Sequence, residues 1–553
     1  MNLSKFPSLK GDVFGGITAG IVALPLALAF GVQSGLGAAA GLYGAIGLGI
    51  FAALFGGTNT QISGPTGPMT VVSAAMITLI IGHKGSLDEA VPSILFCFFL
   101  AGAIMILMGV LRIGQYIKYI PYPVVSGFMT GIGVIIIILQ FFPMLGYDSP
   151  KTILEILRNI NDPVQNIHWP SLGLTALTML IVYIFPKIST LVPSTLVALI
   201  IVTIMAVFIP IDVKIIGDIP SGLPAFHFDI FTAMADINIV LMPAVTLAAL
   251  GAIDSLLTSV VADNVTRTSH NSNKELIGQG LGNMVAGFIG GIPGAGATMR
   301  TLVNIKSGGT TKLSGVIHGI FLLLVLLGIS SLASRIPIPV LSGILFTVGI
   351  SIVDRRGLSH IGKITKTDAF VLIIVLILTV FVDLLQAVAA GMIISSVIFI
   401  KQMGDITQKD STSTSIQTSK EAEKLHDRYH IPNEIRPYVS IKRINGPLFF
   451  GNSEYFLQLG KKVADEIAVL VIDMKRVPYI DQSGLYALES IVLSLEQKSI
   501  QVFLLHLQKQ PEAMMRNILL IPNVIELETI FDDEELCAES IKILIKNNKN
   551  IST

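Results

Sequence analysis

The stretches QISGPTGPMT (residues 61–70) and GGIPGAGATMRT (residues 290–301) each interrupt an apolar region with glycine and proline, and each leads into a short apolar segment. Pro65 and Pro293 lie 228 residues apart (293 − 65). The first apolar segment begins near residue 13 and the eighth near residue 240, which is about the same offset. Interruptions at matching positions predict two repeated halves of seven helices, with a binding site at the breaks.

The physical reason lies in the unpaired backbone of an interrupted helix. At membrane depth, non-helical backbone must line a cavity or be buried in protein. A helix that begins there directs free N–H groups and the positive end of its dipole inward. Two such helix starts facing each other would form an anion site that needs no basic side chain. The alternative is two ordinary kinks or re-entrant turns that bind no ligand.

About fourteen apolar segments precede residue 404, and several are long enough to span a hydrocarbon core of about 30 Å. They begin near residues 13, 36, 66, 93, 124, 171, 191, 240, 275, 297, 313, 337, 368 and 386. An even number of crossings puts both ends of this region on one side. The loops and ends assigned to that side carry fifteen Lys and Arg, and the opposite loops carry five. The positive-inside rule therefore predicts that both termini are cytoplasmic.

The composition separates a membrane region from a soluble one. Charged residues number 36 in residues 1–403 and 38 in the last 150. Overall, 13% of residues are charged and the mean hydropathy is +0.74, against roughly 25% charged residues in a soluble protein. This excludes an ordinary soluble enzyme, a disordered protein and a nucleic-acid binder. Lys and Arg together equal Asp and Glu at 37 each, so net charge indicates no polyanionic partner. Cys97 and Cys537 lie in different regions, so no disulfide framework is expected.

We predict three parts: a transmembrane domain over residues 1–403, a linker over 404–436 and a soluble domain over 437–553. The linker prediction depends on a polar stretch, Asp405 to Lys420, that contains DSTSTS (410–415). The last part alternates strand-like and helix-like patterns and is predicted to be a small α/β domain. Asp481 and Ser483 precede a helix there, so one of them is expected to be its N-cap. The alternative for Ser483 is a regulatory site, phosphorylated or contacted by a partner.

One acidic residue lies inside an apolar segment. Asp254 would be costly there unless it had a function, and Thr258, four residues on, shares its helix face. A carboxylate, a hydroxyl and backbone carbonyls suit a hard monovalent cation, for which sodium is the natural candidate. A protonatable Asp254 without a metal is one alternative. A structural Asp254 that caps a neighbouring helix or pairs with Arg300 is another.

Three motifs together resemble the SulP family of anion transporters: SGP (63–65), DSLLT (254–258) followed by VAD (261–263), and Asp473 with DQSGL (481–485). The resemblance implies an α-helical polytopic membrane protein of two inverted seven-helix repeats, joined to a cytoplasmic α/β STAS domain. ALPLALAFG (23–31) and TQISGPTGPMT (60–70) are most similar to the sodium-dependent bicarbonate carriers of that family. Many other members have Glu at the position of Asp254 and Gln at that of Leu26, so both residues depart from the sulfate-type pattern.

By motif position, the resemblance also implies which residues bind the transported ions. The implied sodium ligands are Asp254, Thr258, Gly296 and Thr298. The implied bicarbonate-binding residues are Thr66, Gly67, Ala297 and Thr298, acting largely through backbone groups.

We therefore expect a secondary active transporter rather than an enzyme, working by alternating access in the bacterial inner membrane and carrying bicarbonate by sodium symport. The sodium ion is co-transported, membrane lipid surrounds the protein, and a homodimer with a possible regulatory partner at the STAS domain is expected. One alternative is a proton-coupled sulfate or dicarboxylate carrier on the same fold. The other is a gated anion channel or a membrane sensor that signals through the STAS domain.

Overall fold

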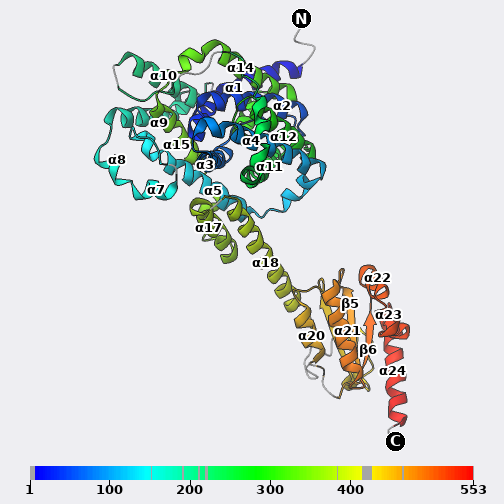
Figure 1. Cartoon of the computed structure of the whole chain (residues 1–553). Helices are drawn as coiled ribbons and strands as arrows, with labels where there is room; N and C mark the ends of the chain where they lie inside the picture. The colour runs from blue at the N-terminus through cyan, green and yellow to red at the C-terminus, as the bar shows by residue number, and fades with distance from the viewer. Residues whose placement is uncertain are drawn as a thin grey trace. The chain divides into compact units, whose positions relative to one another are not determined.

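The computed structural model describes residues 7–150, 152–189, 192–209, 212–217, 222–382, 384–410, 412–413, 426–461, 463 and 466–551. The chain divides after Ser395 into two compact units. The first consists of helices, and the second is built around a sheet (Figure 1).

The helices of the first unit form two series, and the last helix of the second series continues past Ser395. The first series comprises α1 (Pro7–Ser34), α2 (Ala38–Phe55), α3 (Gly67–Lys84), α4 (Leu87–Val110), α5 (Tyr122–Leu139), α9 (Trp169–Ile188) and α10 (Ser194–Phe208). The second comprises α11 (Ile237–Thr266), α12 (Ser272–Phe288), α13 (Thr298–Lys306), α14 (Lys312–Ala333), α15 (Ile338–Ile352), α17 (Lys366–Phe381) and α18 (Leu384–Asp410). The connections contain short elements: η2 (Ile113–Tyr119), α6 (Phe141–Met144), α7 (Ile153–Arg158), α8 (Asn161–Gln165), η3 (Phe228–Asp236) and α16 (Arg355–Ser359).

The contacts within one series are repeated in the other. Helix α4 packs against α12, as α14 packs against α2. Helix α1 packs against α14 as α11 does against α4, and α5 packs against α17 as α15 does against α9. This reciprocity is what a two-fold axis between two structural repeats produces. It also sorts the helices into two bundles: α1–α4 with α11–α14, and α5, α9, α10, α15 and α17.

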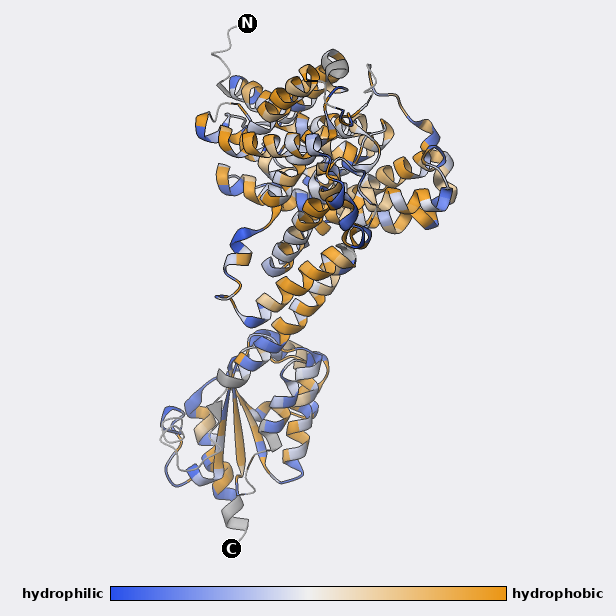
Figure 2. Cartoon of the chain, turned by 90° about the vertical axis from the view of Figure 1, so that its left-hand side faces the viewer, coloured by the Kyte–Doolittle hydropathy of each residue, from blue (hydrophilic) through white to orange (hydrophobic). Residues whose placement is uncertain are grey.

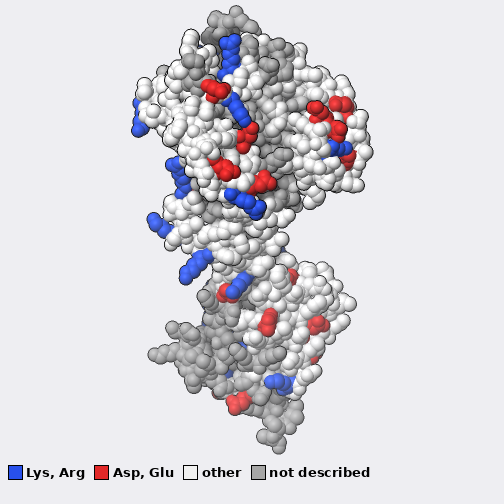
Figure 3. Space-filling model, turned by 60° about the vertical axis from the view of Figure 1, so that its left-hand side comes forward, with Lys and Arg blue, Asp and Glu red and all other residues white. Residues whose placement is uncertain are grey.

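Apolar side chains cover much of the first unit. Among the described residues, seven helices are long and apolar enough to cross a membrane, and three shorter helices are also apolar. Figure 2 shows the hydrophobic colouring along these helices. On the face drawn in Figure 3, charged side chains of this unit gather in a few groups, and much of the other described surface is uncharged. The protein is therefore a multi-pass membrane protein, while the exact number of fourteen spans stays a prediction.

The second unit has a five-stranded sheet in the order β3-β4-β5-β6-β7. Strands β4 to β7 are parallel and β3 is antiparallel to β4. The strands are β3 (Thr412–Ser413), β4 (Val439–Asn445), β5 (Val469–Arg476), β6 (Gln501–Leu505) and β7 (Ile530–Phe531). The helices are α20 (Ser453–Lys461), α21 (Gln482–Glu496), α22 (Lys509–Asn517), α23 (Leu520–Asn523) and α24 (Glu534–Ile551), with 3-10 turns η4 (Arg436–Tyr438) and η5 (Leu527–Thr529).

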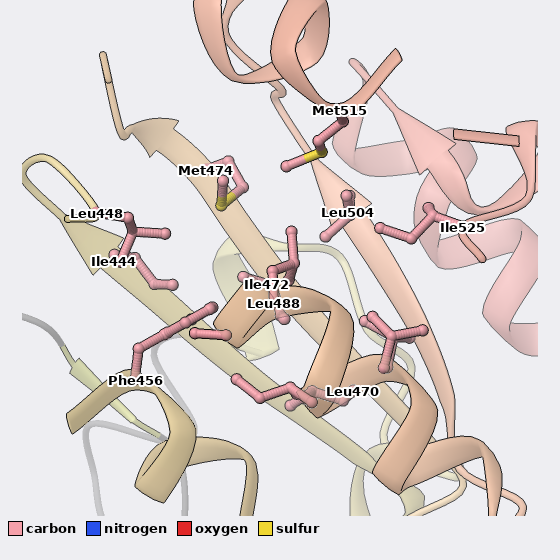
Figure 4. Packing of buried hydrophobic residues seen from close by; sticks show 14 of the residues in the cluster. Ile444, Leu448, Phe456, Leu470, Ile472, Met474, Leu488, Leu504, Met515 and Ile525 are labelled. Atoms are coloured by element: carbon pink, nitrogen blue, oxygen red, sulfur yellow. The ribbon is translucent and has the colours of Figure 1, made fainter. Parts of the chain in front are cut away.

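Alternating residues of β4, β5 and β6 build a core on each face of this sheet, because successive side chains of a strand point to opposite sides. Ile472 of β5 packs with Leu488 of α21 and Phe456 of α20 on one face, as Figure 4 shows. Val471 packs on the other face with Ile541 of α24. The predicted α/β domain is thus confirmed.

The expected linker differs from the structure in one part. Helix α18 continues to Asp410, so residues 405–410 are helical rather than irregular. Thr412 and Ser413 pair with β4. The linker prediction failed there because polar Ser and Thr residues favour loops only on average, and the apolar helix before them propagates into the polar stretch. Residues 414–425 lie outside the described residues.

Candidate functional site

The two interrupted segments meet each other directly. Strand β1 (Ser63–Gly64) pairs antiparallel with β2 (Ala295–Gly296). Helix α3 then begins at Gly67 and α13 begins at Thr298. The two short strands satisfy backbone groups that a break at membrane depth would otherwise leave unpaired. The predicted meeting of the two breaks is therefore present.

Glycine is required where these segments cross. A Cβ on Gly294 would lie 2.1 Å from the carbonyl oxygen of Gly64, and one on Gly296 would lie 2.1 Å from Nε2 of Gln61. A Cβ on Gly67 would lie 2.8 Å from side-chain atoms of Ile136 on α5 and of Ile352 on α15. The glycines thus allow the two segments to approach each other, and they allow α3 to begin directly against the second bundle.

Both half-helices begin without a side-chain cap. Within the described part of the chain, no side chain bonds back to the free N–H groups of α3, whose N-cap is Thr66, or of α13, whose N-cap is Ala297. The first N–H groups of a helix need such a partner or a ligand, and an anion is the ligand that they favour. Thr66, Gly67, Ala297 and Thr298, which the sequence assigned to the anion, are the residues at these two helix starts.

The hydroxyl of Thr66 does not cap its own helix because it faces α11. Its Oγ1 donates to Oδ2 of Asp254 at 2.8 Å. Asp254 is nearly buried, with 9% of its surface exposed. Among the described residues no ion pair joins Asp254 to Arg300. The Nη2 group of Arg300 instead donates to the carbonyl of Pro65, and its Nη1 has no hydrogen-bond partner in the part of the chain that the structure describes.

Thr258 connects the same face of α11 to the second break. Its Oγ1 donates to the carbonyl of Gly296 at 2.9 Å and lies 2.8 Å from Oγ1 of Thr298. Carboxylate, hydroxyl and carbonyl oxygens are therefore supplied by Asp254, Thr258, Thr298 and Gly296, the four residues that the sequence assigned to a cation. Hard cations take oxygen ligands of these kinds, and the binding of sodium by these four residues stays a prediction.

The two repeats differ at this point. Helix α3 and helix α13 begin 231 residues apart (298 − 67). At that offset, the positions on α1 that match Asp254 and Thr258 are Ala23 and Ala27. Both alanines are buried, and a Cβ on Gly41 of α2 would lie 1.8 Å from the carbonyl of Ala27. On α1 these positions allow close helix packing, whereas on α11 they carry polar groups.

A buried polar network behind the two strands was missed by sequence reasoning. It consists of Gln61, Ser259, Glu275 and Gln279, all buried. Glu275 lies in the first turn of α12, where an acidic side chain usually interacts favourably with the helix dipole. The sequence therefore gave no sign that Glu275 has a further role. Ser259 lies four residues after Ser255, whose Oγ accepts from the N–H of Gly296 at 3.1 Å.

Ser483 lies in the other unit, in the first turn of α21. Asp481 is the N-cap there, since its Oδ1 accepts from the N–H of Gly484 at 2.8 Å. The expectation that one of the two residues is the cap is confirmed for Asp481. A regulatory role of Ser483 stays a prediction.

The fold and the site define a multi-pass membrane transporter rather than an enzyme. The chain belongs to the sulfate permease family, whose pattern matches residues 9–375, and residues 430–536 match the STAS domain. The resemblance to SulP transporters with a STAS domain is confirmed.

Individual proteins and solved structures are also similar to this chain. The bicarbonate transporter BicA of Picosynechococcus sp. (strain ATCC 27264 / PCC 7002 / PR-6) is 39% identical over 546 residues, which cover 98% of this chain and 96% of that protein. The putative sulfate transporter YvdB of Bacillus subtilis (strain 168) is 34% identical over 524 residues, covering 93% and 94%. The solved transmembrane domain of a cyanobacterial BicA is 47% identical, with a TM-score of 0.64, and covers 69% of this chain and 98% of that one. The structure of SLC26A9 is 17% identical and covers 100% of this chain and 92% of that one, with a TM-score of 0.82, so it supports the fold alone.

Proposed function

We propose that this protein imports bicarbonate together with sodium by alternating access. The observation that carries the proposal is the position of α11 between the two breaks. Asp254 accepts from Thr66 at the start of α3, and Thr258 contacts Gly296 and Thr298 at the start of α13. A cation beside Asp254 would therefore lie next to the two helix starts that favour an anion.

This arrangement supports coupling because the two ions offset each other's charge. Bound sodium adds a positive charge near the anion, and bound bicarbonate adds a negative charge near the cation. By linkage each ion then raises the affinity for the other by the same factor. A single carboxylate on α11 also suits a monovalent cation, since its charge is balanced by one positive charge.

The choice of bicarbonate depends on the similar proteins. An anion site made of backbone N–H groups accepts several oxyanions. The name bicarbonate transporter belongs to the relative at 39% identity, and the name putative sulfate transporter to the one at 34%. The second name favours one rival, a proton-coupled sulfate carrier on the same fold.

The two bundles support alternating access. The polar site belongs to the first bundle, and Gly67 abuts Ile136 and Ile352 of the second. A cavity of about 410 Å³ also lies between the bundles, with Gln33 of α1 and Ile77 of α3 on one wall and Gln140 and Ser342 on the other. Rocking of one bundle against the other would open the site to each side in turn. We further propose an inner-membrane homodimer with both termini and the STAS domain in the cytoplasm, where a regulatory partner could bind Ser483.

The test is uptake of radiolabelled bicarbonate into proteoliposomes with an inward sodium gradient, and then with choline in place of sodium at the same pH. Carbonic anhydrase inhibitor and excess sulfate serve as controls. We expect saturable uptake that needs sodium, runs against the bicarbonate gradient and is unaffected by sulfate. Uptake driven by a pH gradient alone, or removed by sulfate, would favour the rival. Unsaturable flux that never exceeds equilibrium would indicate a channel.

A further inference from the structure

The carboxylate of Glu275 on α12 accepts four hydrogen bonds. Its Oε2 accepts from the backbone N–H groups of Gly57 and Thr58, both at 2.8 Å. Its Oε1 accepts from the side-chain amides of Gln61 and Gln279, also both at 2.8 Å. Only 1% of the Glu275 surface is exposed. A buried carboxylate with four donors holds every one of those donors in place.

Three of these donors extend to the site. The hydroxyl of Thr58 lies 2.8 Å from that of Ser259 on α11. Gln61 accepts through Oε1 from the hydroxyl of Ser259 at 2.9 Å, and Ser259 adjoins Thr258 on α11. The same amide group of Gln279 that contacts Glu275 also donates to Oγ of Ser63 at 2.6 Å, and Ser63 pairs with Gly296 in the β1–β2 ladder. Glu275 is therefore connected to the site by two routes, one through α11 and one through β1.

We propose that Glu275 is a positioning residue for ion binding. It acts on α11 by holding Gln61, which contacts Ser259 of that helix, and it acts on β1 by holding Gln279, which contacts Ser63. Glu275 touches neither ion in this arrangement. It fixes the distance from Thr258 on α11 to the carbonyl of Gly296 and to the hydroxyl of Thr298, and Thr298 is the residue assigned to both ions. The inference rests on the proposed function for the identity of the ions, but not for the geometry.

Asp12 on α1 offers a matched comparison. Its carboxylate is also buried, with 1% exposed. It accepts from the backbone N–H groups of Thr310 and Thr311 at 2.7 and 2.9 Å, and from the hydroxyl of Thr311. It thus holds a turn between two helices, as Glu275 holds the turn at residues 57–58. All its hydrogen bonds end in the 310–311 turn, so a purely structural role would give the two carboxylates the same phenotype.

The experiment compares Glu275→Ala with Asp12→Ala in full-length protein reconstituted in proteoliposomes. For each variant, the half-saturating sodium and bicarbonate concentrations, the maximal rate and the thermal midpoint in detergent are measured. We expect similar losses of thermal midpoint in both. Only Glu275→Ala is expected to raise half-saturating sodium, by roughly 10- to 100-fold, the range for outer-shell partners of metal ligands. Glu275→Gln keeps one acceptor oxygen and is expected to recover part of this affinity.

Ser259→Ala keeps the test decisive if Glu275→Ala does not fold, because it cuts the route to α11 and leaves all four hydrogen bonds of Glu275 intact. We expect a smaller rise in half-saturating sodium and a smaller loss of thermal midpoint than in Glu275→Ala, because only the contacts of the Ser259 hydroxyl with Gln61, Thr58 and Ser255 are lost. The proposal would be overturned if the half-saturating concentrations of Glu275→Ala lay within twofold of those of Asp12→Ala. It would also be overturned if those of Ser259→Ala lay within twofold of those of the parent protein. If the parent protein shows no sodium dependence, the sodium coupling fails instead, and half-saturating bicarbonate decides the role of Glu275 by the same comparison.

Discussion

Each unit of the molecule contains a buried aspartate, and the two are satisfied very differently. Asp254 on α11 accepts one hydrogen bond among the described residues, from Thr66. Asp473 at the end of β5, 2% exposed, accepts from Tyr429, from the N–H of Lys475 at 3.0 Å, and from Arg443 at 3.3 Å. Nδ1 of His506 lies 3.1 Å from Oδ1 of Asp473, the oxygen that also accepts from Lys475.

The difference separates a structural carboxylate from one that is ready for a ligand. A buried charge that is fully hydrogen-bonded is fixed by its neighbours and stabilises the fold around it. A buried charge with a single donor retains unused acceptor capacity, which is costly unless an ion occupies it for part of the working cycle.

Replacement of Asp254 by Ala should remove transport and leave the fold intact. Sodium-driven uptake is expected to fall by about two orders of magnitude or more, since outer-shell partners alone account for 10- to 100-fold. The thermal midpoint without sodium should stay the same or rise, because the substitution also removes the cost of burying a carboxylate that has a single hydrogen-bond donor. Uptake in proteoliposomes and thermal unfolding in detergent measure the two effects, with exposed Asp88→Ala as the control. A large loss of stability would make Asp254 a structural residue.

Replacement of Asp473 by Ala should destabilise the second unit and leave sodium binding unchanged. Loss of a buried, paired charge leaves Arg443 and Tyr429 without their partner and is expected to cost about 3–5 kcal/mol of the free energy of unfolding of the second unit. Hydrogen exchange of the β5 amides in the full-length protein measures this loss. Half-saturating sodium at low temperature should match that of the parent. Unchanged exchange protection in β5 would contradict a structural role for Asp473.

Replacement of Thr258 by Val keeps the shape of the side chain and removes one oxygen from the cation side of the site. Loss of this one polar interaction, worth about 1–1.5 kcal/mol, predicts a roughly tenfold rise in half-saturating sodium. Thr246→Val on the same helix is the control, because its hydroxyl bonds only to the carbonyl of Met242 within α11. Equal sodium responses of the two variants would remove Thr258 from the cation site.

The second unit should lose stability in acid through Asp473. Burial of Asp473 raises its pKa, but the hydrogen bonds from Tyr429, Lys475 and His506 outweigh burial and hold the pKa below the ordinary 3.8. A lowered pKa in the folded state contributes stability above the ordinary value, and this stability is lost as pH falls through the folded value. Exchange protection of β5 should therefore decline as pH falls below about 4. The decline should be flatter in Asp473→Asn, and equal slopes would contradict this assignment.

Much of the site could be predicted because its residues break a local rule. QISGPTGPMT and GGIPGAGATMRT place glycine and proline where a membrane helix should continue, and Asp254 is a charge inside an apolar run. Such violations indicate function because they are costly in any other role. Thr258 was predictable because it shares a helix face with Asp254.

The remaining residues obey local rules and therefore gave no signal. Glu275 has the position of an ordinary acidic residue in a first helical turn. Gln61 and Ser259 are ordinary polar residues until the fold brings the segment before β1 against α11, where the two residues meet although they lie 198 positions apart in the sequence. The end of α18 could not be placed either, since a strong apolar helix extends into a polar stretch that favours a loop when taken alone.

The difference between Ala23 and Asp254 bears on how such a molecule could arise. If the two repeats descend from one gene whose product paired with itself, every side chain of that pair occurred twice across the axis. A carboxylate at the α11 position would then have been accompanied by a second one at the α1 position, doubling the charge beside the anion. Asp254 in one repeat with Ala23 at the matching position of the other became accessible to selection only after gene fusion, when each repeat could mutate independently. In this history the pair of helix starts that favours an anion is ancestral, and the carboxylate of Asp254 that favours a cation is derived.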